Sequence, residues 1–428
     1  MGTEQELLEY LRGSALYVYG AGIYAGRLIN RLNRNGIEVQ GILVTNREGN
    51  PSDMAGIRVQ AAESLAGSGI DITGLTVAVA LAKGQLEILD YLLSLGFEKI
   101  VLISQDIWQE IKERESGQQK VEDDYEYRLD YDYPSLEPNH CAVIEKSTGQ
   151  ALFRVPLYVD ANLREVWREK CKRESFEALY GEFDKLPFEQ GEYVSRELAQ
   201  RERIELYAAV SHADKQRRIE VRKNGVIPLQ VGAALTGMRL GCQTDDTGEN
   251  ISAENRNFCE ITGLYWIWKN TAGQTYAGLI HYRRRLRWDE TSVRYMIDRE
   301  LDAVIILPQF SPQPVNEYFL RFICRHDWQF MKEAVLRYDN TYVDIFERYE
   351  QGHFFIPCNM AVFKRAWFDQ YCEFAFAVAA EVDNRYKKMQ VVRQDRYMGY
   401  LFENLLSLFL IRYHREMKVA YSDMEFIR

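Results

Sequence analysis

The stretch ALYVYGAGIYAGRLINRLNRNG, residues 15–36, decides the fold of the first part of the chain. Its apolar opening, residues 15–20, predicts a strand, and residues 25–36 have the spacing of an amphipathic helix that stops at a glycine. The turn between them carries Gly20, Gly22 and Gly26. A strand, a glycine turn and a helix in this order predict the first unit of a Rossmann-like parallel sheet.

The same alternation continues along the chain and divides it into two α/β regions. Further strands are predicted at residues 39–45, 75–81 and 99–104, with a helix at 85–97. We therefore expect a Rossmann-like domain over residues 1–110, an acidic, Tyr-rich linker and helical connector over 111–200, and a second α/β domain over 201–428. In the last region strands are predicted at 204–212, 275–286 and 301–308, and helices at 256–269, 315–337, 366–388 and 396–415. Ligands of such folds bind beyond the carboxyl ends of the strands.

Composition excludes several classes of protein. The 428 residues are 46% hydrophobic and carry a net charge of −10, which disfavours a general nucleic-acid binder. The seven cysteines form no C-x-x-C pair, so no disulfide framework or zinc site is expected. Neither a signal peptide nor an apolar run long enough to span a bilayer is visible. These features predict a cytoplasmic protein, at most held at the inner face of the membrane, with residues 404–415 as a candidate contact or, preferably, a core helix.

The turn with Gly20, Gly22 and Gly26 predicts binding of a nucleotide, since a helix amino end attracts phosphate. Its spacing is G-x-G-x-x-x-G, and the second strand ends in Thr45-Asn46 where an NAD site has an acidic residue. Both features disfavour a dehydrogenase. The segment resembles the small Rossmann-like domains that precede sugar-modifying enzymes, which implies a nucleotide or nucleotide-sugar ligand. An empty turn in a degenerate module is the alternative.

The second region contains several motifs close together in the sequence. Residues 244–252 read TDDTGENIS, 257–270 read NFCEITGLYWIWKN, and 276–284 read YAGLIHYRR, with His353, Asn359 and RYMGYLFE (396–403) downstream. Together they resemble a family of capsular and exopolysaccharide glycosyltransferases long catalogued as a domain of unknown function, over residues 204–415. The resemblance implies a GT-A-like nucleotide-diphosphosugar transferase domain. The chain departs from the family where its first strand ends in Ser211-His212-Ala213-Asp214-Lys215.

The strand that ends in His281 is followed by Arg283 and Arg284. Arginines at that place could neutralise a departing diphosphate, because guanidinium groups make forked contacts with phosphate oxygens. This favours transfer without a metal, although Mn²⁺ or Mg²⁺ remains possible. A solvated basic loop is the alternative for the arginine run.

Further donor-binding candidates are polar residues within or near the motifs. Asp245 and Asp246 suit a ribose or metal contact, or a plain surface turn, and Glu260 is expected to pair with an arginine because an unpaired buried carboxylate is costly. A catalytic base must be a carboxylate or a histidine close to the acceptor hydroxyl. Glu403 and Asp395 are the carboxylate candidates, with His281 as a third catalytic residue. The other residues expected to bind the donor or the sugar are Asn250, Asn257, His353 and Asn359.

The leading hypothesis is a glycosyltransferase that moves a hexose from a UDP-linked donor to a surface-polysaccharide or lipid-linked acceptor. The resemblance alone suggests galactose, in pyranose or furanose form. Two alternatives are an NAD-dependent sugar-nucleotide oxidoreductase, which would use the first domain, and an inactive binding or scaffold protein.

Overall fold

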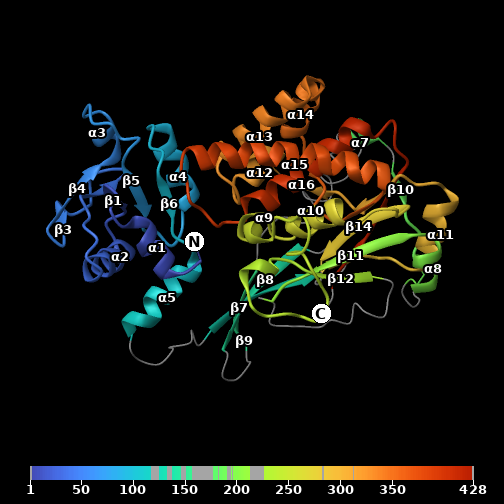
Figure 1. Ribbon diagram of the computed structural model, residues 1–428, viewed down its shortest axis with the longest axis horizontal. Helices are drawn as coiled ribbons and strands as arrows, with labels where there is room; N and C mark the ends of the chain where they lie inside the picture. The colour runs from blue at the N-terminus through green and yellow to red at the C-terminus, as the bar shows by residue number, and fades with distance from the viewer. Residues whose placement is uncertain are drawn as a thin grey trace.

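The computed structural model describes residues 2–116, 125–132, 137–145, 151–156, 177–181, 183–189, 194, 196–212, 226–281, 284–311 and 313–426 (Figure 1). Two parallel-dominated sheets, each covered by helices, form two α/β units. The α/β class predicted from the sequence is therefore confirmed.

The first unit is a six-stranded sheet with the order β3-β4-β2-β1-β5-β6. All its strand pairs are parallel except the β3–β4 hairpin. Its strands are β1 (Leu16–Tyr19), β2 (Gly41–Val44), β3 (Asp53–Met54), β4 (Ile57–Ala61), β5 (Thr76–Val79) and β6 (Ile100–Leu102). Its helices are α1 (Glu4–Leu11), α2 (Ile23–Arg34), α3 (Ala62–Ala66), α4 (Gln85–Ser94) and α5 (Gln105–Ser116). The strands and helices predicted around residues 15–104 are present, and the hairpin of β3 and β4 was not foreseen.

The prediction for the connecting segment was wrong. Where a linker and helices were expected, the chain forms an antiparallel three-stranded sheet of β7 (Tyr125–Asp132), β8 (Glu137–Glu145) and β9 (Ala151–Pro156). The sequence of β7, YEYRLDYD, alternates large apolar or aromatic residues with charged ones, which is the period of a strand. Its acidity hid this alternation. Most of the helix predicted at 163–183 lies outside the described residues, and only α7 (Glu177–Tyr180) is seen.

The second unit is built on an eight-stranded mixed sheet with the order β10-β20-β16-β19-β14-β11-β12-β13. Within it β19 alone runs antiparallel to its neighbours β14 and β16. The strands are β10 (Asp184–Lys185), β11 (Ile204–Val210), β12 (Val226–Gln230), β13 (Gln243–Thr244), β14 (Tyr276–His281), β16 (Ala303–Ile306), β19 (Ala361–Lys364) and β20 (Val419–Ser422). Two small ladders pair β15 (Arg284–Leu286) with β21 (Met424–Phe426) and β17 (Gln309–Phe310) with β18 (Phe354–Phe355).

Helices cover both faces of this sheet, as the alternation of buried residues along its strands requires. Tyr207 and Ala209 of β11 join a core with the long C-terminal helices, whereas Leu206 and Ala208 face a second core with α8 (Arg196–Arg201) and α11 (Glu290–Asp298). The remaining helices are α9 (Asn255–Phe258), α10 (Ile261–Asn270), α12 (Val315–Phe319), α13 (Arg325–Tyr338), α14 (Val343–Glu350), α15 (Arg365–Lys388) and α16 (Tyr397–Tyr413).

The helix predicted at 396–415 is a core helix. In α16 the apolar side chains Leu405, Leu406, Leu408, Phe409 and Ile411 are buried, so they offer no surface to a membrane. Within the part of the chain that the structure describes, no helix combines the length and apolar character that a membrane span requires.

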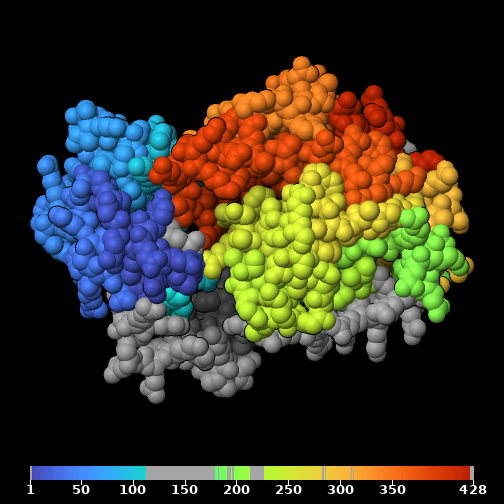
Figure 2. Space-filling model, viewed as in Figure 1, coloured from blue at the N-terminus to red at the C-terminus, as the bar shows by residue number. Residues whose placement is uncertain are grey.

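The two units share a hydrophobic core and a backbone link. Residues of β5 and α4 belong to the same buried cluster as α13 and α16, and Figure 2 shows the N-terminal unit packed directly against the C-terminal helices. Val392, just before α16, pairs with Val101 at the free edge of β6, with backbone hydrogen bonds of 2.8 Å to both Ile100 and Leu102. A residue of the second unit thus extends the sheet of the first.

The Asp90 carboxylate adds a polar contact between the units. It accepts hydrogen bonds from the backbone N–H groups of Arg325 (2.6 Å) and His326 (3.0 Å) and lies 2.6 Å from His326 Nδ1. Burial acts to raise the pKa of Asp90, but these hydrogen bonds outweigh it and hold the pKa below its usual value. A carboxylate at the amino end of α13 also interacts favourably with the helix dipole.

Replacing Asp90 by alanine is expected to destabilise the protein by about 1–2 kcal/mol at pH 7, the usual worth of a helix cap. Because the folded-state pKa is depressed, the contribution of this carboxylate is present above its unfolded-state value of 3.8 and fades as the pH falls below it. Urea denaturation at pH 7 and pH 3.5 measures the difference. Glu87→Ala is the control, because Glu87 lies on the exposed face of α4, the helix that also carries Asp90. An equal loss in both variants would contradict the role assigned to Asp90.

Candidate functional site

The site is assembled where several chain segments meet beyond the strand β14. His281 is the last residue of β14 and pairs with Ala209 of β11, so it stands at the carboxyl edge of the parallel part of the sheet. The first residues of α16 and the loop before β19 approach the same edge, as the contacts below show. This is the edge at which α/β folds bind ligands.

The helix predicted at 256–269 is interrupted, and the interruption builds the site. Cys259 has a positive φ of 53°, which ends α9 at Phe258 and lets α10 begin at Ile261. Glu260 therefore occupies the N-cap of α10, where its carboxylate turns towards the loop before β19. A positive φ is costly for a side chain other than glycine, and such conformations concentrate at functional sites.

Three more residues with positive φ lie near this break, and two of them contact it directly. They are Cys358 (φ 69°), Asn359 (φ 50°) and Arg396 (φ 64°). Arg396 Nε lies 3.1 Å from Cys259 Sγ, and Asn359 Nδ2 donates a hydrogen bond of 3.0 Å to Glu260. Strained backbone from three separate segments thus converges on one place.

Glu260, His281 and Asn359 form the polar centre of the site. Asn359 bridges Glu260 and the backbone carbonyl of Gly399 (2.9 Å), and His281 Nε2 lies 3.5 Å from Glu260 Oε1, too far for a good hydrogen bond. His281 Nε2 and Asn359 Oδ1 are buried and have no hydrogen-bond partner among the described residues. A buried polar atom without a partner costs about 1–3 kcal/mol, so these atoms are suited to a ligand.

His281 is held in its neutral form. Burial lowers its pKa and outweighs the opposing effect of Glu260, while Arg284 and Arg396 lower the pKa further. A neutral imidazole can accept a proton or a hydrogen bond as well as donate one. Among the described residues Glu260 pairs with Asn359 and lies near His281, and its expected pairing with an arginine of the 283–284 pair stays a prediction.

Glu403 in α16 faces the same centre. Burial, followed by repulsion from Glu260, raises its pKa to about 8, although a backbone hydrogen bond from Cys358 and the charges of Arg284 and Arg396 act in the opposite direction. A carboxyl group with this pKa is poised to exchange a proton near neutral pH. Of the three predicted catalytic residues, Glu403 and His281 lie together.

Asp395, the other carboxylate proposed as a base, is engaged elsewhere. Both its oxygens accept hydrogen bonds from Arg393, at 2.7 and 2.5 Å, in a bidentate ion pair. Burial raises its pKa despite that arginine. This ion pair helps to hold the segment that leads into α16, and a role of Asp395 as a base stays a prediction.

Two exposed guanidinium groups border the site. Arg284 Nη1 lies 3.2 Å from Cys358 Sγ, and Arg396 contacts Cys259 as described. Both are close enough to Glu403 and His281 to shift their pKa values. Arg283 lies outside the described residues. The predicted cationic site is therefore represented by Arg284 together with Arg396, to which the sequence analysis had given no role.

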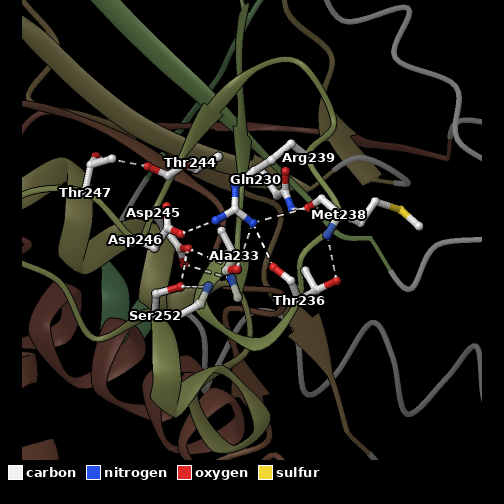
Figure 3. A network of polar contacts seen from close by, with 12 residues as sticks. Gln230, Ala233, Thr236, Met238, Arg239, Thr244, Asp245, Asp246, Thr247 and Ser252 are labelled. Atoms are coloured by element: carbon white, nitrogen blue, oxygen red, sulfur yellow. Dashed lines mark hydrogen bonds and ion pairs between the residues drawn. The ribbon is translucent and has the colours of Figure 1, made fainter.

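Asp245 is buried, and its carboxylate accepts hydrogen bonds from four internal donors, of which Ala233 and Ser252 are labelled in Figure 3. It accepts from the backbone N–H groups of Gly232 (2.9 Å) and Ala233 (3.0 Å) and from the hydroxyls of Ser252 (2.5 Å) and Thr262 (2.6 Å). The carboxylate thereby ties the turn after β12 to the loop before α9 and to α10. Asp245 therefore supports the loops of the site, and both its oxygens are already used within the protein, so neither is open to a sugar nucleotide.

Replacing Asp245 by alanine is expected to destabilise the protein by about 3 kcal/mol or more, because two buried N–H groups and two hydroxyls lose their acceptor. The neighbouring Asp246 is a matched control: it pairs only with the half-exposed Arg239 (2.8 Å), a contact worth under about 1 kcal/mol. Chemical denaturation of D245A and D246A measures both values. Similar losses in the two variants would contradict the structural role of Asp245.

The remaining predicted donor contacts are dispersed. Asn250 is bonded within its own turn, to Gly248 and Ser252, and His353 Nδ1 lies 2.9 Å from the Ser311 carbonyl. Asn257 Oδ1, in α9, is buried without a partner among the described residues. The same holds for His212 Nδ1, two residues beyond β11, which the sequence indicated only as part of the departure from the family pattern.

The glycine turn of the first unit has the geometry of a βα turn. Gly20 has φ 112°, a backbone conformation that residues other than glycine rarely adopt. Gly22 is the N-cap residue of α2. A Cβ at Gly22 or Gly26 would meet no atom within 4 Å, so packing does not explain these two glycines. Nucleotide binding at Gly20, Gly22 and Gly26 stays a prediction.

Comparison with known proteins adds the following. Residues 208–415 match a family model described as a domain of unknown function (DUF4422), in agreement with the family resemblance found over residues 204–415. No curated protein matches the chain. Among the described residues no group of three or more His, Cys, Asp or Glu is placed to hold a metal ion.

The chain is also similar, at low identity and low TM-score, to parts of solved glycosyltransferases. WbbM, a bifunctional glycosyltransferase in its apo form, is 21% identical with a TM-score of 0.45, over 52% of this chain and 45% of that chain. Core-mannan synthase A of Aspergillus fumigatus, in an Mn/GDP form, is 13% identical with a TM-score of 0.30, over 57% and 82%. The mannosyltransferase Ktr4p of S. cerevisiae is 10% identical with a TM-score of 0.30, over 62% and 80%. The chain thus spans less than half of the WbbM chain.

Proposed function

We propose that the chain is a glycosyltransferase that moves a hexose from a nucleotide-diphosphate sugar, UDP-linked in the first instance, to a saccharide acceptor. One observation carries the proposal: two exposed guanidiniums, of Arg284 and Arg396, stand beside a carboxyl group with a pKa of about 8 and two buried polar atoms that have no partner within the described parts of the chain. The cations suit a diphosphate, the polar atoms suit sugar hydroxyls, and the carboxyl group suits proton transfer.

In the proposed reaction an acceptor hydroxyl oxygen forms a bond to the anomeric carbon of the donor. The bond from that carbon to the diphosphate oxygen breaks, and its electron pair leaves with the diphosphate. Arg284 and Arg396 offset the negative charge that develops there. The hydroxyl proton passes to the ionised carboxylate of Glu403. Asn359 and His281 form hydrogen bonds with hydroxyl groups of the sugar.

In this proposal the second unit is a GT-A-like transferase domain, and arginine side chains, in place of a divalent metal, bind the diphosphate. The positions of Arg284 and Arg396 support this choice, and a dependence on Mn²⁺ or Mg²⁺ is the competing possibility. Galactose or galactofuranose as the hexose, a surface-polysaccharide or lipid-linked acceptor, and work at the inner face of the membrane rest on the family resemblance. No role in binding nucleic acid is proposed.

The test is binding and hydrolysis of UDP-galactose, UDP-glucose, GDP-mannose, and dTDP- and CMP-sugars by the full chain, with Mn²⁺ or with EDTA. A ligand that binds only the folded state raises the unfolding midpoint. We expect one UDP-sugar to raise it, and we expect Arg284→Ala and Arg396→Ala to weaken that binding at least about tenfold, the worth of a charge-assisted contact. Arg294→Ala, an exposed arginine of α11, is the control.

Two results would overturn the proposal. Binding of NAD(H) without any nucleotide sugar would favour the oxidoreductase alternative, in which the first unit carries the function. Binding of a nucleotide sugar that the Arg284 and Arg396 variants leave unchanged would remove the site described here from the reaction. Loss of binding on addition of EDTA would overturn the metal-free form of the proposal alone.

A further inference from the structure

The first two turns of α16 open to the surface at one place. Between Tyr397 and Ile411 every residue is buried except Tyr400 and Glu403. These two positions are three residues apart, so they lie on the same face of the helix. The one exposed face of this part of α16 therefore presents an aromatic ring next to the carboxyl group proposed as the base.

Two further aromatic rings extend this surface from the opposite side. Phe322 stacks on Tyr400 with ring centroids 5.1 Å apart and an angle of 21°, and Tyr318 lies 5.6 Å from Phe322. All three rings are only half-buried, unlike Phe319 and Phe355 behind them. Tyr318 of α12, Phe322 and Tyr400 thus form a continuous aromatic surface, here called the aromatic platform.

The platform lies near the proposed base. Burial raises the pKa of both Tyr318 and Tyr400, and the charge of Glu403 raises both further, whereas Arg321 lowers the pKa of Tyr318 and Arg396 that of Tyr400. Both phenol groups are therefore within electrostatic reach of Glu403. The exposed guanidinium of Arg321 lies over one face of the Tyr318 ring, 4.3 Å from its centroid, and 5.5 Å from the Phe322 centroid, so it adds N–H donors beside the rings that remain open.

We propose that the aromatic platform is the acceptor subsite and binds the apolar C–H face of a saccharide ring. The proposal rests on the proposed function, since it places the acceptor hydroxyl at Glu403. A sugar ring has one face of C–H groups and a rim of hydroxyls. The platform offers flat apolar rings for the first and phenol, guanidinium and carboxyl groups for the second. The competing occupant of such rings is the base of the donor nucleotide.

The probes that distinguish these occupants are the methyl glycosides of galactose, glucose and mannose, and UDP alone. Saturation-transfer NMR on the full chain reports which ring protons contact the protein. We expect at least one methyl glycoside to give signals from its C–H face, and Phe322→Ala and Tyr400→Ala to weaken its binding about fivefold or more. UDP binding is expected to stay unchanged in both variants.

Three variants keep the test decisive if the alanine substitutions disturb folding. Tyr400→Phe and Phe322→Leu retain a flat or bulky apolar side chain, and we expect Y400F to bind the glycoside within about twofold of the wild type and F322L to bind it more weakly than Y400F. Tyr10→Ala, an exposed tyrosine of α1, is the control and is expected to change nothing. Unfolding midpoints establish that each variant is folded.

The outcomes separate this proposal from the function it rests on. Loss of UDP binding in F322A and Y400A, or glycoside binding that both leave intact, would overturn the acceptor subsite. A wild-type chain that binds a methyl glycoside through the platform but neither binds nor hydrolyses any nucleotide sugar would support the subsite and overturn the transferase.

Discussion

Replacing Glu403 by glutamine is expected to reduce glycosyl transfer at least about 100-fold and, at the same time, to make the folded protein more stable at pH 8. The loss of rate is the usual contribution of a positioned general base. The gain in stability arises because burial and the repulsion from Glu260 penalise the charged carboxylate in the folded state, and the amide carries no charge.

The sign of the pH dependence follows from the raised pKa. The pKa of Glu403 rises from 4.5 in the unfolded chain to about 8 in the folded state, so between these values the folded state holds a proton that the unfolded state has lost. The free energy of unfolding therefore falls as the pH rises through this window, by about 1.4 kcal/mol per unit at most. The full stability is present below pH 4.5 and is lost as the pH passes about 8.

Two measurements check this. Denaturation of the wild type and E403Q at several pH values is expected to show similar stabilities near pH 4.5 and a difference on the order of 3 kcal/mol in favour of E403Q at pH 8. In the wild type, kcat/KM for transfer is expected to rise with pH up to about 8. Glu373→Gln, at an exposed position of α15, is the control. An E403Q variant that is inactive but less stable than the wild type at every pH would contradict the account.

The regular parts of the fold were predictable because local patterns and tertiary packing agree there. The strands of the first unit and β11, β14 and β16 are short apolar runs, and α15 and α16 have long helical periodicity, so their sequences suffice. The sheet of β7–β9 was missed because its alternation is carried by tyrosines and charged residues. The antiparallel position of β19 between β14 and β16 is a matter of long-range pairing, which no local pattern states.

Part of the candidate site was predictable from the sequence, but its geometry was not. Glu260, His281, Asn359 and Glu403 were all singled out, and the structure brings them together. What the sequence hides is the break at Cys259, since nothing in an apolar helical pattern foretells a positive φ at a cysteine. Local rules fail at Cys259, Cys358 and Arg396 because the surroundings impose these conformations. For the same reason nothing in the sequence indicated that Arg396 lies in the site.

Replacing Arg393 by methionine is expected to destabilise the protein by about 3–5 kcal/mol. Arg393 is buried and holds two carboxylates, Asp327 at 2.7 and 3.0 Å and Asp395 at 2.7 and 2.5 Å. Removing the cation leaves the fully buried carboxylate of Asp327 beside the partly buried one of Asp395, and the two charges repel each other. A broken buried ion pair costs this much.

The effect can be assigned by a second substitution and a control. Asp327 is fully buried, so Arg393→Met combined with Asp327→Asn removes one of the stranded charges and is expected to recover part of the loss. Asp327 also accepts from Tyr386 and from the Cys324 backbone, which the amide oxygen can still do in part. Arg385→Met, whose partners Glu333 and Glu381 are more exposed, is expected to cost under about 1 kcal/mol.

The position of Arg393 also predicts a functional effect that stability alone would not give. Val392 before it is hydrogen-bonded to the edge of β6 in the first unit, and Arg396 after it lies in the site with φ 64°. Arg393 therefore fixes the segment that joins the first unit to Arg396, one of the two arginines proposed to bind the diphosphate of the donor. We expect R393M, at temperatures where it stays folded, to bind the donor nucleotide at least about fivefold more weakly, whereas R385M binds it normally. Unchanged nucleotide affinity in folded R393M would show that Arg396 is positioned without this anchor.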